Sequence, residues 1–600
     1  MSNSWNQDNN RRKLLFALGC MIGAILYLVI YGADTLRFTN DIWLLHSDDL
    51  EGSIDLTQHY LGWMFYRRTP WAFPFGLTQG IYWENVSVVF TDSIPLFAVF
   101  FKLLSPLLPE TFQYFGLFGL CCYTFMGGFG ALLLCRFCEG WSLPLLAALL
   151  FCLSPVMLNR MYLHTALSAH FLLVAALVLW AYAGEMSQRK KITHWSLLAV
   201  VGTLINAYFT PMILGTMLCS LLQEVLAGKK IRKILLPMMI PVVTLLLSGY
   251  IVGMFYGQVP ASGGGLDILS FNLDAFSNPM TYLSHYGKRT FTPDEFVAFN
   301  YSSFLPSLPL YTTYQNEGFA YLGLGILLLW VLLVSLLILK VVRGKIKEDK
   351  RAWYAWLPVA IYLIVFLLLA LSPRWTLGER ELLYLSYPDV IVRCLSIFRS
   401  TGRFIWPVYY MLLAGAIILL SKIIKNSRWT VIILAVVTII QVADLYPGVE
   451  QKHEAFSNVT PYESRLSEEA WDYLGEHADS IVFYPPTLQG LYYDCKTSME
   501  FEIFALKHDL DLNMTYMSRD LTSLADEKTY QHFEERKEGL RDSDRIYIFL
   551  DCAVEELPEE KIYGLHYYQI DGYIVGTEQD LDRFVTPGGI GLVGDKRDNE

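Results

Sequence analysis

The stretch FAYLGLGILLLWVLLVSLLILK, residues 319–340, carries one charged side chain, Lys340, at its end. A helix of about 20 apolar residues matches the hydrocarbon core of a bilayer, which is ~30 Å thick. The whole chain has 600 residues, of which 54% are hydrophobic and 17% are charged, and its mean hydropathy is +0.36. Because soluble domains have a larger charged fraction, we predict a mainly α, polytopic helical membrane protein.

Ten further stretches have the same apolar character, which gives about eleven predicted transmembrane helices. They are residues 13–32, 113–135, 141–154, 166–185, 194–209, 211–227, 234–255, 353–372, 403–421 and 429–446. The apolar run 91–108 contains Pro95, Lys102 and Pro106. We expect this run to lie at the membrane interface or to re-enter the membrane rather than to cross it.

The positions of Lys and Arg set the predicted orientation, because these residues favour short cytoplasmic loops. With a cytoplasmic N-terminus and no crossing at 91–108, every basic cluster falls on the cytoplasmic side. The clusters lie at residues 11–13, 136, 189–191, 229–233, 340–351 and 422–428. If 91–108 crossed, every later cluster would lie outside, so the orientation with eleven spans is favoured.

This orientation divides the chain into a membrane domain, residues 1–446, and an extracytoplasmic tail, residues 447–600. The outer loops are then 33–112, 155–165, 256–318 and 373–402, and the two long ones exceed the length of simple connectors. The acidic tail alternates short apolar runs with helix-like segments, which predicts a small α/β domain. The runs are 481–486, 545–550 and 567–577, and the helix-like segments are 462–476 and 521–540.

The first outer loop contains SDDLEGSIDLTQHYLGW, residues 47–63, where charged residues crowd beside a predicted span. Charges near a membrane are costly, so such a cluster indicates a functional site. On a helix Asp55 and His59 share one face. The Asp55 carboxylate could then take a proton from a hydroxyl while His59 orients the hydroxyl or binds a phosphate. The alternative is that Asp55 only caps or solubilises an interfacial helix. Asp48 and Asp49 are further carboxylates, and Asp92 either caps the run 91–108 or supports the site.

Two later segments contribute further polar candidates at the same face. SPVMLNRMYLHTALSAH, residues 154–170, contains Arg160, His164 and His170, which are either ordinary interfacial residues or substrate-binding residues. Glu317 precedes a span and could hydrogen-bond sugar hydroxyls or cap the helix. The aromatic residues of RRTPWAFPFG, residues 67–76, could stack on sugar rings or anchor the protein at the interface.

Three arginines precede the span that begins near residue 403, in the stretch PDVIVRCLSIFRSTGRFIW. Arg393, Arg399 and Arg403 lie on the predicted outer side, where basic residues are disfavoured in short loops. A guanidinium presents a planar fork of donors that matches phosphate oxygens. We therefore predict contact with a lipid phosphate, with snorkelling of the side chains to the interface as the alternative.

The sequence excludes several other chemistries. No Gly-rich phosphate loop, HExxH or GxSxG motif occurs, and the ten cysteines have no metal-ligand spacing. A net charge of −11 and the lack of a basic, aromatic stripe give no sign of a nucleic-acid partner. An enzyme for nucleotide sugars would need a sizeable cytoplasmic domain, and the predicted topology has none. An activated sugar donor would therefore be lipid-linked.

Five stretches together carry a resemblance to a known superfamily: DLTQHYLGWMFYR, VVFTDSIPL, LSPVMLNRMYLHTALSAHFLL, NEGFAYLGLGILLL and FRSTGRFIWPVYY. They resemble the GT-C superfamily of polytopic membrane glycosyltransferases and, more narrowly, the bacterial DUF6311 family of GT-C-like proteins. The matching stretches lie within residues 1–446. The resemblance implies an integral protein of the bacterial plasma membrane.

GT-C enzymes pass a sugar from a polyprenyl-phosphate carrier to an acceptor outside the cytoplasm, usually with inversion. The resemblance thus implies a polyprenyl-phosphate sugar donor and a glycan, glycolipid or protein acceptor of the cell envelope. By position in the first outer loop Asp55 would be the base, with Asp48 or Asp49 as alternatives. Arg399 or Arg403 would hold the carrier phosphate. Some relatives use a divalent metal, for which this sequence shows no clear carboxylate pair.

Two other classes of function compete with a transferase. A membrane transporter or flippase of lipid-linked glycans would place polar residues deep in its spans and break helices near mid-membrane. Predicted spans such as 319–340 are instead uniformly apolar. A non-catalytic scaffold, or a glycan ligase of another fold, is the third class. A scaffold would tolerate Asp55→Asn without loss of function.

Overall fold

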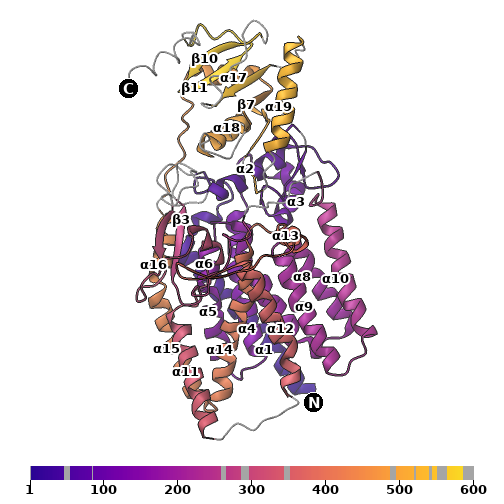
Figure 1. Cartoon of the computed structure of the whole chain (residues 1–600), viewed down its shortest axis with the longest axis vertical. Coiled ribbons are helices and arrows are strands. Elements are labelled where there is room, and N and C mark those ends of the chain that lie inside the picture. The colour runs from indigo at the N-terminus through magenta and orange to yellow at the C-terminus, as the bar shows by residue number, and fades with distance from the viewer. Residues whose placement is uncertain are drawn as a thin grey trace.

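The computed structural model describes residues 2–45, 54–83, 85–257, 265–284, 296–343, 352–457, 459–486, 495–515, 517–518, 522–539, 544–550 and 564–585. Long helices run side by side in the lower part of Figure 1, and a small domain of strands and helices lies above them. We call the end of the helical bundle nearer to this domain the domain-proximal end. The first helix, α1 (Ser2–Tyr31), begins at the opposite end, where the N-terminus lies.

Nine helical stretches within the described residues are long and apolar enough to cross a membrane. They are α1, α4 (Phe115–Cys135), α5 with α6 (Ser142–Cys152 and Pro155–Arg160), α9 (Phe209–Leu226), α10 (Arg232–Ile251), α11 (Leu324–Val342), α12 (Ala352–Leu371), η7 with α14 (Thr401–Ile405 and Trp406–Ile423) and α15 (Ser427–Asp444). These helices are compatible with the predicted integral membrane protein.

Two of the eleven predicted spans are not among these nine helices. The stretch 166–185 forms a 3-10 turn followed by α7 (Phe171–Ala181), whose 11 residues extend only ~16 Å at 1.5 Å per residue. The stretch 194–209 falls mainly on α8 (Gln188–Ile205), whose first turn holds the basic residues 189–191 and so has a shorter apolar part. The predicted number of eleven spans is therefore not confirmed.

Shorter elements connect the long helices, and α2 and α3 among them lie at the domain-proximal end (Figure 1). They are α2 (Ile54–Arg68), β1 (Leu77–Thr78), β2 (Val86–Ser87), α3 (Pro95–Leu104), β3 (Met280–Ser284), β4 (Phe296–Asn300), η6 (Thr313–Gly318), β5 (Arg374–Leu377), β6 (Arg380–Tyr384), α13 (Asp389–Leu395) and α16 (Tyr446–Ser457). Each strand pair here is an antiparallel hairpin.

The apolar run 91–108 forms α3 and starts and finishes at the domain-proximal end. Before α3, the Ser93 hydroxyl donates to the backbone oxygen of His59 in α2 at 2.7 Å. After it, the Gln113 amide donates to the backbone oxygen of Thr35, just beyond α1, at 2.8 Å. Both hydrogen bonds lie at the end of the bundle where α1 finishes, as expected for a segment that does not run the length of the bundle.

Helices α1 and α4 approach closely because glycines lie at their contact. A Cβ atom on Gly23 of α1 would lie 2.0 Å from the backbone oxygen of Tyr123 in α4. A Cβ atom on Gly127 of α4 would lie 2.2 Å from the backbone oxygen of Gly19. Glycines spaced by four residues, as Gly19 and Gly23 are, let two membrane helices pack at short distance.

Gly23→Val is expected to destabilise the bundle, because its Cβ would meet a backbone oxygen that moves only if α1 and α4 separate. Overpacking of this kind costs about 1–3 kcal/mol, so the midpoint of thermal unfolding in detergent should fall. Gly415→Val is the matched control, because a Cβ on Gly415 of α14 meets no atom within 4 Å. Equal midpoints for the two variants would contradict the close contact.

The C-terminal domain contains a five-stranded sheet of order β10-β11-β9-β7-β8. Parallel pairing joins β7 to β8 and to β9, whereas β11 pairs antiparallel with β9 and β10. The elements are β7 (Ser480–Tyr484), β8 (Asp511–Leu512), β9 (Arg545–Phe549), β10 (His566–Ile570) and β11 (Tyr573–Thr577), with α17 (Glu469–His477), α18 (Cys495–His508) and α19 (Thr522–Lys537). The three predicted apolar runs thus form β7, β9 and the β10–β11 hairpin.

This domain packs directly on α2. Phe65 of α2 belongs to the same buried apolar cluster as Trp471 and Phe501 of the domain. Arg68, the last residue of α2, donates to the backbone oxygens of Ala505 (3.2 Å) and Leu510. The C-terminal domain therefore contacts and stabilises α2, the helix that carries Asp55.

Arg68→Ala is expected to loosen α18 from α2, because two carbonyl oxygens lose their donor at a cost of about 1–3 kcal/mol. Backbone hydrogen exchange should then rise in both helices. Arg67→Ala is the control, since Arg67 donates instead to the backbone of Leu108 and Glu110 beyond α3. Unchanged exchange in α18 of Arg68→Ala would show that this residue does not hold the domain in place.

Candidate active site

The first turn of α2 places Asp55 at the boundary between solvent and the buried interior. The side chain of Asp55 is 20% exposed, and a carboxylate in a first helical turn is stabilised by the N–H groups of the helix end. His59 lies one turn later and is buried. Burial lowers the pKa of His59 to about 4, although nearby Asp55 raises it. The Nδ1 atom of His59 has no hydrogen-bond partner among the described residues.

The imidazole that contacts Asp55 is that of His164, from the turn after α6. Its Nε2 lies 3.1 Å from Asp55 Oδ2, and its Nδ1 lies 3.4 Å from Arg160 Nη1. Since a guanidinium can only donate, Nδ1 accepts, and Nε2 carries the proton that faces the Asp55 carboxylate. Burial lowers the pKa of His164 to about 3, although Asp55 and Glu317 raise it. His164 is therefore neutral at pH 7, and its Nε2 faces the Asp55 carboxylate.

Behind His164, one buried carboxylate joins two buried arginines. Glu317 Oε2 accepts from Arg403 Nε at 2.7 Å and lies 2.9 Å from Arg160 Nη2, which donates to the backbone oxygen of Glu317 at 3.0 Å. Burial raises the pKa of Glu317, but the charges of Arg160 and Arg403 outweigh burial and hold that pKa well below its usual range. Buried charges are tolerated when paired and hydrogen-bonded in this way. Asp55, His164, Arg160, Glu317 and Arg403 thus form one connected set, which we call the charge network.

Glycines explain how the segments that carry Glu317 and Arg403 meet. A Cβ atom on Gly402 would lie 2.8 Å from the Cα atom of Gly318, and one on Gly318 would lie 2.7 Å from the Cα atom of Phe271. Only glycine allows backbones to approach so closely. The turns η6 and η7 therefore touch, which brings Glu317 within reach of Arg403.

Asp92 lies beside the charge network rather than at the cap of α3. Its Oδ1 accepts from Asn206 Nδ2 at 3.4 Å, and its charge acts on Arg403. The N-cap position of α3 is Ile94, with no side-chain hydrogen bond. Asp92 is therefore not the N-cap residue of α3, and its support of the site stays a prediction.

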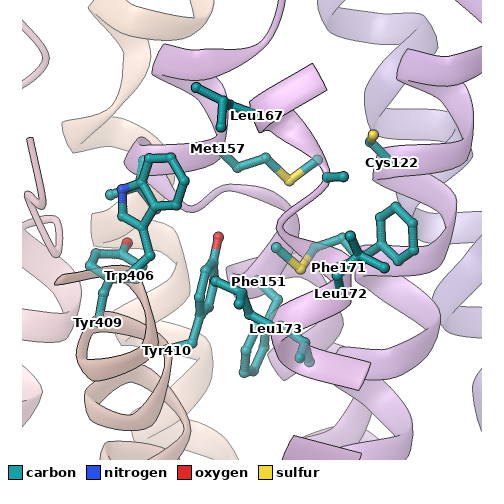
Figure 2. Close-up of a cluster of buried hydrophobic side chains, with 14 of the residues drawn as sticks. Cys122, Phe151, Met157, Leu167, Phe171, Leu172, Leu173, Trp406, Tyr409 and Tyr410 are labelled. Carbon is teal, nitrogen blue, oxygen red and sulfur yellow. The ribbon is translucent and has the colours of Figure 1, made fainter. Parts of the chain in front are cut away.

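His170 lies deeper in the core, below the charge network. Its Nδ1 is 2.9 Å from the Tyr410 hydroxyl, and its ring is 4.4 Å from that of Trp406. Figure 2 shows Trp406 and Tyr410 within a cluster of buried apolar side chains. The guanidinium of Arg160 lies over Trp406, 5.8 Å from the ring centroid. His170 thus packs under the site and has no contact with Asp55 or Glu317 among the described residues.

The three predicted phosphate-binding arginines separate into two kinds. Arg403 is buried and paired with Glu317, whereas Arg393 and Arg399 are exposed. Arg399 still lies close to the charge network. The backbone N–H of Ser400 donates to the Tyr208 hydroxyl at 2.7 Å, and the Tyr208 ring lies 4.6 Å from Arg403. Sequence reasoning missed Tyr208, because one Tyr beside a predicted span carries no distinguishing pattern.

Two further predictions concern carboxylates and metals. Asp48 and Asp49 lie outside the described residues, so their position relative to Asp55 stays a prediction. Across the segments that the structure describes, no group of three or more His, Cys, Asp or Glu side chains could hold a metal ion.

Comparison with known proteins places the chain in a family. The family model described as "Domain of unknown function (DUF6311)" matches residues 20–446, and the "DUF6311 C-terminal domain" matches residues 470–578. No curated protein matches the chain. The first match covers most of the helical part, including every residue of the charge network, and the second covers the sheet domain. This chain therefore belongs to the DUF6311 family.

Proposed function

We propose that this protein is a GT-C-type membrane glycosyltransferase that moves a sugar from a polyprenyl-phosphate carrier to an acceptor in the bacterial cell envelope. The contact between Asp55 and His164 carries the proposal. A partly exposed carboxylate beside a neutral imidazole suits the removal of a proton from a hydroxyl. Its place at the end of a bundle of long apolar helices suits a donor that is carried by a lipid.

In the proposed step, Asp55 takes the proton of an acceptor hydroxyl, and the hydroxyl oxygen bonds to the anomeric carbon of the sugar. The bond between that carbon and the carrier phosphate breaks, and its electron pair leaves on the phosphate oxygen. The anomeric carbon has oxocarbenium character in the transition state, as in glycoside hydrolysis. One direct displacement inverts its configuration and leaves Asp55 protonated.

We assign the carrier phosphate to Arg399 rather than to Arg403. The side chain of Arg399 is exposed and has no ion pair among the described residues, whereas Arg403 is committed to Glu317. A guanidinium beside the phosphate would stabilise the charge that develops on the leaving group. Arg403 would act through Glu317 and Arg160, which together hold His164 in place. Arg393, exposed on α13, would be a second contact for the carrier.

Arg399→Gln is expected to raise the KM for the polyprenyl-phosphate donor by about 10-fold or more. A hydrogen bond to a charged group contributes about 1.5–3 kcal/mol, and 1.4 kcal/mol is tenfold in affinity. The measurement is initial rate against donor concentration in detergent micelles. The control is Arg380→Gln, which replaces an exposed arginine of β6. An equal KM in the two variants would show that Arg399 does not bind the carrier phosphate.

The function itself is tested with purified protein in proteoliposomes, supplied with labelled polyprenyl-phosphate sugars and an envelope extract. We expect labelled acceptor and an equal amount of sugar-free carrier. Movement of intact lipid-linked sugar across the vesicle membrane, with no new glycosidic bond, would assign the protein to the transporters instead. Neither product across a broad panel of donors would reject both functions for these substrates.

A further inference from the structure

The loop after α2 presents three aromatic side chains to the surface. Trp71, Phe73 and Phe75 are 44%, 56% and 46% exposed. Their rings contact one another edge to face, with centroids 6.1 Å apart for Trp71 and Phe75 and 5.5 Å apart for Phe73 and Phe75. Clusters of exposed aromatic side chains usually mark a surface that binds a protein, a ligand or a membrane, so this cluster indicates a binding surface.

The loop is fixed to the end of a membrane-length helix. The backbone N–H of Phe75 donates to the Ile251 oxygen at the end of α10 at 2.8 Å, and the Phe73 ring lies 5.7 Å from that of Tyr250. A Cβ atom on Gly76 would lie 2.2 Å from the Val252 oxygen, so glycine is needed for this approach. The aromatic cluster is therefore level with the end of a predicted span.

A second apolar surface lies on α3. Phe100 and Leu103 of α3 are 54% and 64% exposed, and their spacing places them on one helical face. Leu107, in the 3-10 turn η2 (Ser105–Leu107) that follows α3, is 85% exposed. Lys102 points inward between two aromatic rings, with Nζ 3.9 Å from the Tyr66 centroid and 4.9 Å from that of Trp71. Lys102 thus joins α3 to the aromatic loop, and the two surfaces are neighbours.

The backbone that follows α3 is hydrogen-bonded by protein. Arg67 donates to the backbone oxygens of Ser105 (3.4 Å), Leu108 (3.2 Å) and Glu110 (2.7 Å). Carbonyl groups need such partners wherever water is scarce. The ten residues of α3 extend ~15 Å, about half of the ~30 Å hydrocarbon core. This segment can enter one leaflet, and it is too short to cross both.

We propose that Trp71, Phe73, Phe75, Phe100, Leu103 and Leu107 form a surface that inserts into the lipid leaflet on the domain-proximal side. Its partner is the boundary between lipid headgroups and acyl chains, where aromatic side chains concentrate. α3 begins three residues after Asp92, beside the charge network, so the insertion sets the site at the level of the lipid headgroups. The proposal stands on these contacts alone and does not depend on glycosyl transfer.

The test is photo-crosslinking of the full chain in vesicles of phosphatidylethanolamine and phosphatidylglycerol. A benzophenone analogue of phenylalanine is placed at Phe73 or at Leu103, both exposed, so that packing is preserved. Val331 on α11, 64% exposed, is the control for a lipid-facing position, and Tyr530 on α19, 51% exposed, is the control for a position on the C-terminal domain.

We expect lipid adducts, detected by mass spectrometry, at Phe73, Leu103 and Val331 and none at Tyr530. Adducts at Val331 alone would overturn the proposal. Crosslinks from Phe73 and Leu103 to a second copy of the chain, in place of lipid, would overturn it as well, because the surface would then be a protein interface.

Discussion

Asp55→Asn is expected to lower the rate of glycosyl transfer by about 10²–10⁴-fold, the contribution of a general base, in a protein that remains folded. Asparagine has the shape of aspartate, and its side-chain oxygen can occupy the position of Asp55 Oδ2, 3.1 Å from His164 Nε2. What is lost is the ability to take a proton. The measurement is the transfer rate at saturating donor, and the KM for donor should stay near that of the wild type.

Asp34→Asn is the matched control for this variant. Asp34 follows α1 in the same predicted outer loop, but its side chain is 71% exposed and pairs with Arg37 at the surface. It should transfer sugar at the wild-type rate with an unchanged unfolding midpoint. If Asp55→Asn also keeps the wild-type rate, the base is another group, and Asp48 and Asp49 become the next variants to test.

The members of the charge network could be named from sequence, whereas their pairing could not. Asp55, Arg160, His164, Glu317 and Arg403 are ionisable residues close to apolar stretches, where charge is costly and therefore informative. The four-residue spacing indicated His59 as the partner of Asp55, because sequence periodicity describes the faces of a single helix. The contact with His164 depends on how separate segments pack, which no spacing within one segment encodes.

The same limit explains why the sequence does not distinguish Arg399 from Arg403 and does not define the ends of the spans. Arg399 and Arg403 look equivalent in FRSTGRF, and only the contact of η7 with η6 buries one and leaves the other exposed. Hydropathy correctly located the nine long apolar helices, since composition alone marks a membrane-length segment. Hydropathy does not show where a helix begins, so the apolar stretch 166–185 is longer than α7, and basic residues occupy the first turn of α8.

Glu317→Gln is expected to destabilise the protein by about 3–5 kcal/mol, the cost of leaving a buried charge without its partner. Both arginines contact a single oxygen, Oε2. The side-chain oxygen of glutamine can occupy that position and accept the hydrogen bond from Arg403 Nε. The substitution therefore keeps this hydrogen bond and removes the charge that offsets Arg160 and Arg403. The midpoint of thermal unfolding in detergent measures the effect.

The control is Glu381→Gln, which removes the partner of Arg374 in the β5–β6 hairpin, where Glu381 is 35% exposed. Ion pairs near the surface contribute only about 0–1 kcal/mol, so its midpoint should move little. Adding Arg403→Met to Glu317→Gln removes one of the two unpaired guanidinium groups and should recover part of the loss. The changes in stability caused by substitutions within one network do not simply add. This recovery therefore distinguishes a loss of charge balance from a loss of packing. If the losses of Glu317→Gln and Arg403→Met simply add, Glu317 does not act as the shared counter-ion, and His164 is held by packing rather than by the charge network.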